Sequence, residues 1–520
     1  MFWADRIAKE IISSKKYKSY WVDDMKTPSG RVHVGSLRGV VIHDLLYKAI
    51  LEQGKTVTYT YCINDMDPMD GFPVYLDREK FYKYMGWPLF KIPSPEKGVT
   101  SFSRYFAKEF IYVFNKIGCF PKIIWTSDLY AKGKFDNLIK ICLNNTDKIR
   151  QLFEKQYKNF KEKDYFPYQP ICPNCGKIST TKIYKWDGKY VYFECRENNV
   201  VYTKGCGFKG RVIPEKQNGK MPWKIEWSAH WKTLSINIEW SGKDHMTQGG
   251  SHEIAAKISE AIFHYPTPHA KSYEHLLIDG KKMSSSKGIG ASAKEVSEIL
   301  PPELLRFLMV RVHYNQTIDF DPMGDTIPGL FDEYDRCAKA YFESGDELLS
   351  RIFVLSQVDS LPKKHLYLPR FRTIISYLQQ PGTAVLTRLK EDKGEDLTPD
   401  EKRIVDERIH FAKLWLTKFA PPDFKIEVRD DIPEEAKKLT PPQKKYLLDL
   451  AKIIGSSVKA EVLQQNLYTL AKKHKISPPQ AFCAIYLSLL GRTAGPKASP
   501  FLLSLDKSLV VKRFTEIGKL

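Results

Sequence analysis

The chain has 520 residues and a mass of 60.1 kDa, which predicts two to four domains and excludes a single small binding module. Apolar residues make up 42% and charged residues 27%, and no apolar stretch is long enough for a membrane helix or a secretory leader, so we expect a cytoplasmic globular protein. A net charge of +20 favours polyanionic partners such as nucleic acid, although acidic membranes or ribosomes would explain it equally well.

A βαβ unit is predicted near the start of the chain. Residues 19–24 read as a strand, and residues 37–50 carry apolar side chains at helical spacing before Gly54, a typical helix-ending residue. Residues 56–63 are rich in β-branched and aromatic residues, which predicts a second strand. Such units build parallel sheets that bind nucleotides at the carboxyl ends of their strands, so we expect chemistry in the loop at residues 25–36.

The rest of the chain is less uniform. Helical periodicity recurs around residues 102–114 and 135–160, and residues 225–290 predict strands and loops. From residue 301 onward the pattern is mainly helical, with a charge-rich joint near residues 390–401 that suggests a domain boundary.

The loop after the first strand has the composition of a phosphate-binding turn. It runs into the HVGS sequence at residues 33–36, where free backbone N–H groups at a helix start favour anionic phosphates. His33 adds a donor, and Gly35 allows close approach to the backbone. A capped helix start with an incidental histidine would read the same way. The candidate nucleotide-binding residues of this loop are Pro28, Ser29, Gly30, His33, Gly35 and Ser36.

A second candidate phosphate loop lies about 250 residues further on. Residues 281–288 read KKMSSSKG and follow an apolar stretch, and lysine ammoniums with neighbouring hydroxyls suit a triphosphate. A solvated polar loop is the alternative. The candidates here are Lys282, Met283, Ser284, Ser285, Ser286 and Lys287.

Residues 240–245 read WSGKDH, and this run supplies further candidates. Asp244 suits ribose hydroxyls or an α-ammonium, and His245 with Tyr273 suits an amino-acid substrate. A metal site formed by His245 and His252 is the alternative. Nearby tryptophans would let an aliphatic stem pack against aromatic rings, although core packing is their commoner role.

Four cysteines gather within a 35-residue window. Cys172 and Cys175 form a C-x-x-C knuckle, and Cys195 and Cys206 follow with ten residues between them. Four thiolates indicate a structural Zn²⁺ site, which would hold the fold together without activating water. A three-thiolate site or a redox disulfide between the first two cysteines remains open.

The HVGS and KMSSS sequences together resemble the HIGH and KMSKS elements of class I aminoacyl-tRNA synthetases. The wider runs TPSGRVHVGSLRG, WSGKDHMTQGGSHE and YEHLLIDGKKMSSSKG are most similar to class I lysyl-tRNA synthetases. The resemblance implies an enzyme that attaches lysine to tRNA(Lys) through a lysyl-adenylate, with ATP and Mg²⁺ as a substrate complex. It also implies an α/β fold in which a Rossmann-type parallel-sheet domain with a zinc-binding insertion precedes helical stem-contact and anticodon-binding domains.

The resemblance also implies roles for individual residues. His33, Ser36, Lys282 and Lys287 would be catalytic, and the other residues of the two phosphate loops together with Asp244 would bind ATP. Related glutamyl and glutaminyl enzymes place an arginine at the position of Asp23, so a carboxylate there suits the ammonium of lysine. The expected lysine-binding residues are Asp23, His245 and Tyr273.

The implied domain bounds follow the motifs. Residues 1–70 and 223–292 would form the two halves of the catalytic domain, and residues 71–222 a connective insertion with the zinc ribbon at 168–212. Residues 293–395 would contact the tRNA stem and residues 396–520 its anticodon, in a chain that we expect to be a monomer. A same-class synthetase for another amino acid and a catalytically inactive RNA-binding paralogue are the two alternatives.

Overall fold

In the computed structural model the chain divides into two compact units. Unit 1 comprises Met1–Asp321 and Arg336–Lys363, and unit 2 comprises Pro322–Asp335 and Lys364–Leu520. The structure describes all residues except 158–159, 161–163, 279, 281–290, 381–383 and 455–458. None of the helices in these described ranges is long and apolar enough to cross a membrane. The five domains expected from the sequence are a finer division, and their bounds stay predictions.

A parallel sheet forms the centre of unit 1 and confirms the predicted βαβ unit. Strands β1 (Tyr20–Lys26), β2 (Val57–Ile63) and β3 (Lys122–Trp125) pair in the order β1-β2-β3, and α2 (Leu37–Glu52) connects β1 to β2. Parallel bridges from Val22 to Ile238 and from Ile238 to His269 add two more segments beyond β1. The resulting order, with the crossover at β1, is that of a doubly wound nucleotide-binding sheet.

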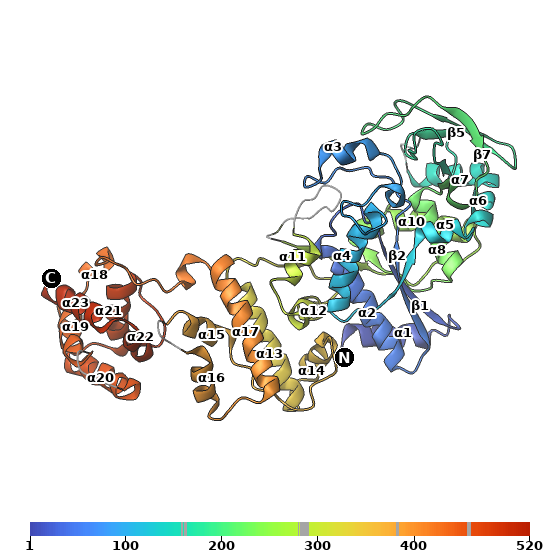
Figure 1. The fold of residues 1–520 in the computed structure, drawn as a ribbon. Helices are drawn as coiled ribbons and strands as arrows, with labels where there is room; N and C mark the ends of the chain where they lie inside the picture. The colour runs from blue at the N-terminus through green and yellow to red at the C-terminus, as the bar shows by residue number, and fades with distance from the viewer. Residues whose placement is uncertain (158–159, 161–163, 279, 281–290, 381–383, 455–458) are drawn as a thin grey trace. The chain divides into compact units, whose positions relative to one another are not determined.

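The two faces of this sheet are covered by different helices. On one face Tyr59 donates a hydrogen bond to the carbonyl of Val40 in α2 (3.0 Å), and Tyr61 packs against Phe110 and Phe114 of α4 (Phe102–Lys116). On the other face Trp21 and Met25 pack with the tryptophans of α8 (Trp223–Leu234). Figure 1 shows α2 and α4 on one side of β1 and β2 and α8 on the other. Adjacent residues of β1 therefore point to chemically different surroundings.

Further helices surround the sheet, and two of them correct the sequence-based expectation for residues 225–290. That region holds α8 and α10 (Ser251–Ala261) between short strands, because Trp223, Trp227 and Trp231 follow a helical spacing that the polar side chains between them interrupt. The short strands pair in parallel as β9 (Ser241–Gly242) with β10 (Ser272–Tyr273) and β11 (Leu276–Leu277) with β12 (Ile318–Asp319). The other α-helices are α1 (Trp3–Ser13), α3 (Arg78–Phe81), α5 (Thr126–Ala131), α6 (Asp136–Asn144), α7 (Thr146–Gln156), α9 (Lys243–Met246), α11 (Ala293–Ser297), α12 (Pro302–Val310) and α14 (Glu347–Ser356).

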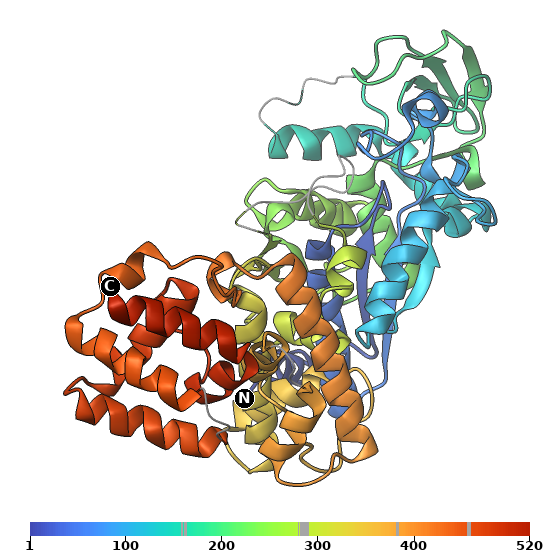
Figure 2. The ribbon, with the colours of Figure 1, turned by 60° about the vertical axis from the view of Figure 1, so that its left-hand side comes forward.

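The cysteine-bearing insertion has its own small sheet. Strands β5 (Thr181–Trp186), β6 (Val191–Cys195) and β7 (Lys209–Val212) form an antiparallel meander, which Figure 2 shows standing apart from β1 and β2. At its base β4 (Gln169–Pro170) pairs with β8 (Gly219–Lys220), so the two ends of the insertion return to the same place.

Two buried arginines fix the helix that follows the HVGS turn. Arg38 donates to the carbonyls of Met309 (2.7 Å) and His313 (2.8 Å), and Arg306 of α12 pairs with Asp44 of α2 at 2.5 Å. These charge-assisted contacts hold α2 rigidly against α12, so the first turn of α2 has a defined position.

Unit 2 is helical, as predicted for the chain beyond residue 301. Its last five helices enclose one apolar core that includes Tyr446, Ile485 and Phe514. The helices that contribute to unit 2 are α13 (Thr326–Phe342), α15 (Phe371–Leu378), α16 (Val385–Lys393), α17 (Pro399–Lys418), α18 (Glu434–Lys437), α19 (Pro441–Ile454), α20 (Ala460–Lys473), α21 (Pro478–Leu490), α22 (Ala498–Ser504) and α23 (Lys507–Lys519). Both helices that flank the charge-rich joint, α16 and α17, lie within this unit.

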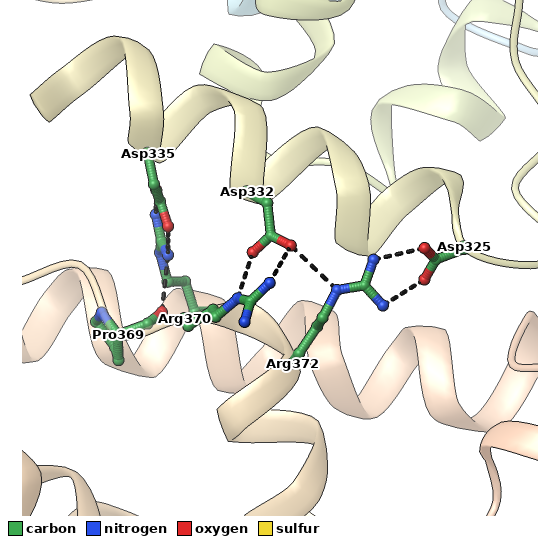
Figure 3. A network of polar contacts seen from close by, with 7 residues as sticks. Asp325, Asp332, Asp335, Pro369, Arg370 and Arg372 are labelled. Atoms are coloured by element: carbon green, nitrogen blue, oxygen red, sulfur yellow. Dashed lines mark hydrogen bonds and ion pairs between the residues drawn. The ribbon is translucent and has the colours of Figure 1, made fainter. Parts of the chain in front are cut away.

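Alternating aspartates and arginines join the start of α13 to its neighbours in unit 2. Arg372 contacts both Asp325 and Asp332, and Arg370 shares the carboxylate of Asp332 (Figure 3). Arg408 of α17 pairs with Asp335 and donates to the carbonyl of Pro369 at 2.8 Å. Shared bidentate contacts of this kind fix helix orientation more strongly than isolated surface pairs.

Candidate active site and cysteine cluster

The turn between β1 and α2 lies beside both flanks of the KMSSS loop. His33 forms an antiparallel bridge with Ser292, and the Ala293 N–H donates to the Val32 carbonyl at 2.8 Å. On the other flank, the Leu276 carbonyl oxygen lies 3.1 Å from the position that a Cβ on Gly35 would occupy. The candidates Lys282, Met283, Ser284, Ser285, Ser286 and Lys287 lie outside the described residues. The HVGS turn and the segments on either side of the KMSSS loop are therefore neighbours in space, although about 250 residues of chain separate the two motifs.

Gly35 occupies a position with little room for a side chain. An added Cβ would lie 3.0 Å from Nδ1 of His33 and 3.1 Å from the Leu276 carbonyl. The 3-10 turn Val34–Ser36 then leads directly into α2, and His33, Gly35 and Ser36 line one cavity. The positive end of α2 therefore opens toward space suited to a phosphate group.

This cavity in unit 1 has a volume of about 720 Å³. Its walls come from the HVGS turn, the carboxyl ends of β1 and β2, the segment before α9, and the start of α8. The candidates that line it are Ser29, His33, Gly35, Ser36, Asp244, His245 and Tyr273. Pro28, Gly30 and Asp23 are described but are not part of the lining. A volume of this size accommodates a ligand larger than an amino acid alone.

Two buried carboxylates make one part of the cavity acidic. Asp24, at the carboxyl end of β1, is 7% exposed, and Glu239, just before β9, is 3% exposed. Glu239 accepts hydrogen bonds from the indole N–H groups of Trp227 (2.9 Å) and Trp231. Among the described residues, neither carboxylate forms an ion pair with a lysine or arginine. Such an arrangement favours a cationic group in the cavity.

The pKa values of both carboxyls reflect this lack of a lysine or arginine partner among the described residues. Burial raises the pKa of the Asp24 carboxyl, although the Met25 N–H and the Lys26 ammonium oppose the shift. Burial also raises the pKa of Glu239 well above its ordinary value, and the nearby Asp23 carboxylate adds to the effect. A bound cation would stabilise the ionised form of both groups.

Aromatic rings form the wall next to Glu239. The ring of His245 lies 5.8 Å from those of Trp223 and Trp227, with nearly perpendicular planes in both cases. Trp231, in contrast, is fully buried and does not line the cavity. Edge-to-face packing of this kind holds His245 at the cavity surface.

Asp23 lies on the opposite face of β1 from the cavity-lining Asp24. Its side chain is fully buried, with one carboxylate oxygen accepting hydrogen bonds from Thr60 and from the Cys62 thiol (3.6 Å). The other oxygen has no hydrogen-bond partner among the residues that the structure describes, and burial raises the pKa of Asp23 well above its ordinary value. Its expected role as a lysine contact stays a prediction that the lining of the cavity does not support.

A buried lysine forms a charged group at another part of the wall. Lys220 of β8 is 1% exposed and contacts the carboxylates of Asp67 and Glu226, the latter at 2.8 Å. Tyr130 donates a hydrogen bond to Glu226 at 2.6 Å. Asp67 and Lys220 both line the cavity, so the base of the cysteine-bearing insertion forms part of its wall.

Sequence reasoning missed Asp24, Glu239 and Lys220. Asp24 and Glu239 each stand next to a residue of a recognised run, but a single carboxylate in a short strand carries no pattern of its own. Lys220 lies in a lysine-rich stretch, where a solvated side chain is the ordinary expectation.

The four clustered cysteines meet in the insertion. Their Sγ atoms all lie within 4.8 Å of one another, with 3.7 Å between Cys172 and Cys206 and 3.6 Å between Cys175 and Cys195. The loop between the last two cysteines folds back, since the Gly207 N–H donates to the Cys195 carbonyl at 2.9 Å. This hairpin brings Cys206 next to the C-x-x-C knuckle despite the long spacing.

This cluster fits a tetrahedral metal ion. Four thiolates at about 2.3 Å from Zn²⁺ would stand about 3.8 Å apart, close to the shorter separations between these sulfurs. All four cysteines are free of disulfide bonds, and a backbone N–H and a side-chain amide point at two of the sulfurs. Such N–H contacts stabilise thiolates in metal sites.

Three comparisons relate the chain to known proteins. A family model described as tRNA synthetases class I (K) matches residues 1–359. The chain is 34% identical over 522 residues to the lysine–tRNA ligase of Thermoplasma volcanium and 31% identical over 514 residues to that of Archaeoglobus fulgidus, with 99% of each chain covered. A solved structure of a glutamate–tRNA ligase from Elizabethkingia meningosepticum aligns with 96% of this chain and 99% of its own, at 13% identity and a TM-score of 0.46.

Proposed function

We propose that this chain, which belongs to the class I (K) tRNA synthetases, acts as a lysine–tRNA ligase and activates lysine with ATP in the cavity of unit 1. Full-length similarity to lysine–tRNA ligases does not favour a synthetase for another amino acid or an inactive RNA-binding paralogue. The observation that carries the proposal is that one cavity joins the helix start at the HVGS turn to two buried carboxylates without a lysine or arginine partner among the described residues.

We assign ATP to the part of the cavity at the first turn of α2. The α-phosphate would lie near the turn at His33, Gly35 and Ser36, with Ser29 on the adjoining loop. Lys282 and Lys287, carried by a loop whose flanks contact this turn, are assigned to the β- and γ-phosphates on the family resemblance. ATP enters with Mg²⁺ as its complex.

Lysine would occupy the acidic and aromatic part of the cavity. Glu239 gives negative potential there, His245 and Tyr273 line the wall, and Trp223 and Trp227 provide rings for the aliphatic stem. An acidic amino acid would meet like charges at Asp24 and Glu239, so this wall also selects against glutamate and aspartate.

The reaction then follows from the relative placement of the two substrates. A carboxylate oxygen of lysine attacks the α-phosphorus of ATP, and the bond from that phosphorus to the bridging oxygen breaks to release pyrophosphate. His33 and the N–H groups at the start of α2 would stabilise the negative charge that develops on the α-phosphate. A terminal hydroxyl of the tRNA next attacks the lysyl carbonyl and releases AMP. No covalent bond to the protein is needed.

We further propose that the four cysteines hold Zn²⁺ as a structural ion. A closed four-thiolate site leaves no position for water or substrate and contributes to folding only. Cys172, Cys175, Cys195 and Cys206 would be its ligands. Because β8 joins this insertion to the cavity wall at Lys220, the ion would also stabilise that part of the wall.

We assign part of the tRNA-binding surface to unit 2. The Lys-Lys pairs at residues 437–438, 444–445 and 472–473 belong to helices of that unit and suit contacts with phosphates. The monomeric state stays an expectation.

The test measures the rate of ATP–pyrophosphate exchange with each of the twenty amino acids in turn. Each reaction is run with and without a tRNA preparation that the enzyme aminoacylates. We expect exchange with lysine alone above background. Exchange with a different amino acid, or none with any amino acid while lysyl-tRNA also fails to form, would refute the proposed function.

A further inference from the structure

The two adjacent aspartates of β1 face different surroundings. In the parallel pair of β1 and β2, Asp23 stands beside Thr60 and Asp24 beside Tyr61. Asp23 is engaged by Thr60 and Cys62 on the face covered by α8. Asp24 points to the face covered by α2, and both Asp24 and Tyr61 line the cavity. Asp24 lines the cavity and Asp23 on the opposite face of β1 does not.

Asp24 shares its position with the hydroxyl of Tyr273 above a glycine of α2. A Cβ added to Gly39 would lie 2.8 Å from Oδ2 of Asp24 and 2.6 Å from Oη of Tyr273. Both oxygens therefore lie close to each other and against the backbone at Gly39, and a side chain at position 39 would displace them. Asp24 and Tyr273 both line the cavity. A carboxylate and a phenol oxygen together form an acceptor pair that suits an ammonium group.

The neighbouring histidine does not neutralise Asp24. The backbone N–H of Trp240 donates to Nε2 of His43 at 2.9 Å, and Nδ1 of His43 lies 2.7 Å from the carbonyl of Gly39. A ring nitrogen that accepts a hydrogen bond carries no proton, so this imidazole is uncharged and its one proton is directed at the Gly39 carbonyl. Oδ2 of Asp24, 3.6 Å from Nδ1, keeps its accepting capacity for a ligand.

We propose that Asp24, together with Tyr273, receives the side-chain ammonium of the amino-acid substrate from the cavity that both residues line. The inference rests on the proposed function, since it identifies the groups that read the end of the lysine side chain. Glu239, held by two indole N–H groups, then supplies the general negative potential, and Asp24 is the residue that distinguishes a charged side-chain end from an apolar one.

The experiment compares Asp24→Asn with Asp23→Asn, a neighbouring pair with the same change in charge and size. Lysine-dependent pyrophosphate exchange with tRNA present gives the KM for lysine and the KM for ATP, and norleucine serves as the substrate analogue without the ammonium. For Asp24→Asn we expect the KM for lysine to rise about 100-fold, as when one partner of a desolvated charge pair is lost, with the KM for ATP within about twofold of its original value. The preference for lysine over norleucine should fall by a similar factor.

A third variant moves the two oxygens without removing the carboxylate. Gly39→Ala places a methyl group against both oxygens, which must shift, and should raise the KM for lysine although Asp24 itself is retained. It keeps the inference testable if Asp24→Asn does not fold.

The outcomes separate the inference from the function on which it rests. A wild-type enzyme without lysine-dependent exchange would overturn the proposed function itself. With an active wild type, an unchanged KM for lysine in both Asp24→Asn and Gly39→Ala would overturn the inference. Equal rises in both KM values for Asp24→Asn, or a larger effect of Asp23→Asn on the KM for lysine, would overturn it as well.

Discussion

Replacement of Lys220 by methionine would remove an ammonium in the cavity wall that contacts the carboxylates of Asp67 and Glu226. Lys220 is 1% exposed, and Glu226 is buried with it, whereas Asp67 is partly buried. Methionine keeps most of the aliphatic stem, so the change isolates the charge. We therefore expect Lys220→Met to lower the free energy of unfolding chiefly through the uncompensated carboxylates.

The magnitude follows from burial. Breaking a buried ion pair by removing one partner costs about 3–5 kcal/mol. Burial raises the pKa of Glu226 to about 7 even though the Lys220 ammonium lowers it, so loss of that ammonium raises this pKa further. A carboxyl whose pKa is higher in the folded than in the unfolded protein destabilises the fold progressively as the pH rises above its unfolded value of 4.5. The loss should therefore be larger at pH 8 than at pH 6.

Urea unfolding followed by tryptophan fluorescence measures this loss in the relevant unit. Every tryptophan except Trp415 belongs to unit 1. The matched control is Lys339→Met, which removes an exposed pair with Glu343 in the same unit and should cost less than about 1 kcal/mol. The double variant Lys220→Met with Glu226→Gln should recover part of the loss, because one of the two uncompensated charges is gone. A loss for Lys220→Met no larger than for the control, or one that shrinks from pH 6 to pH 8, would refute the reasoning.

Three further predictions concern the site and the insertion. His33→Ala should slow lysine-dependent pyrophosphate exchange about 100-fold, the usual effect of losing one transition-state donor, and an unchanged rate would remove His33 from the mechanism. Cys206→Ser should lower the zinc content measured by native mass spectrometry from one ion per chain to none and lower the melting temperature, whereas Cys483→Ser, outside the cluster, should change neither. Lysine binding should tighten as the pH rises above the ordinary carboxyl values of 3.8 and 4.5, and it should release protons in calorimetry carried out in buffers of different ionisation enthalpy, because burial raises the pKa values of Asp24 and Glu239 in the free protein and a bound cation favours their ionised forms. Affinity that weakens over this rise in pH would contradict the last prediction.

The local elements near the HVGS turn were predictable because their patterns are local. Residues 37–50 repeat apolar side chains at helical spacing, and α2 runs from Leu37 to Glu52. Gly54 has a φ of +73°, the left-handed conformation that glycine adopts readily after a helix. The strand at residues 56–63 likewise appears as Val57–Ile63, since β-branched and aromatic residues favour an extended, half-buried backbone.

Other predictions failed or stayed open where distant residues decide the outcome. The helices α8 and α10 occupy a stretch expected to hold strands and loops, because their apolar spacing is interrupted by polar groups that tertiary contacts satisfy. Cys206 stands ten residues beyond Cys195, and only the hairpin between them brings its sulfur to the other three. The roles of Asp23, His245 and Tyr273 remain predictions, although two of the three line the cavity.

The βαβ start, the helical second half, the C-x-x-C knuckle and the family were predictable without a structure, because each depends on spacing between near neighbours or on motifs that are each a short run of residues. Only the tertiary structure decided that Asp24 and Glu239 share a cavity with the HVGS turn and that Asp23 lies outside its lining. The physical reason is that the charge a ligand meets depends on which face of a strand is covered and which carboxylates lack a cation, and both follow from packing between segments hundreds of residues apart.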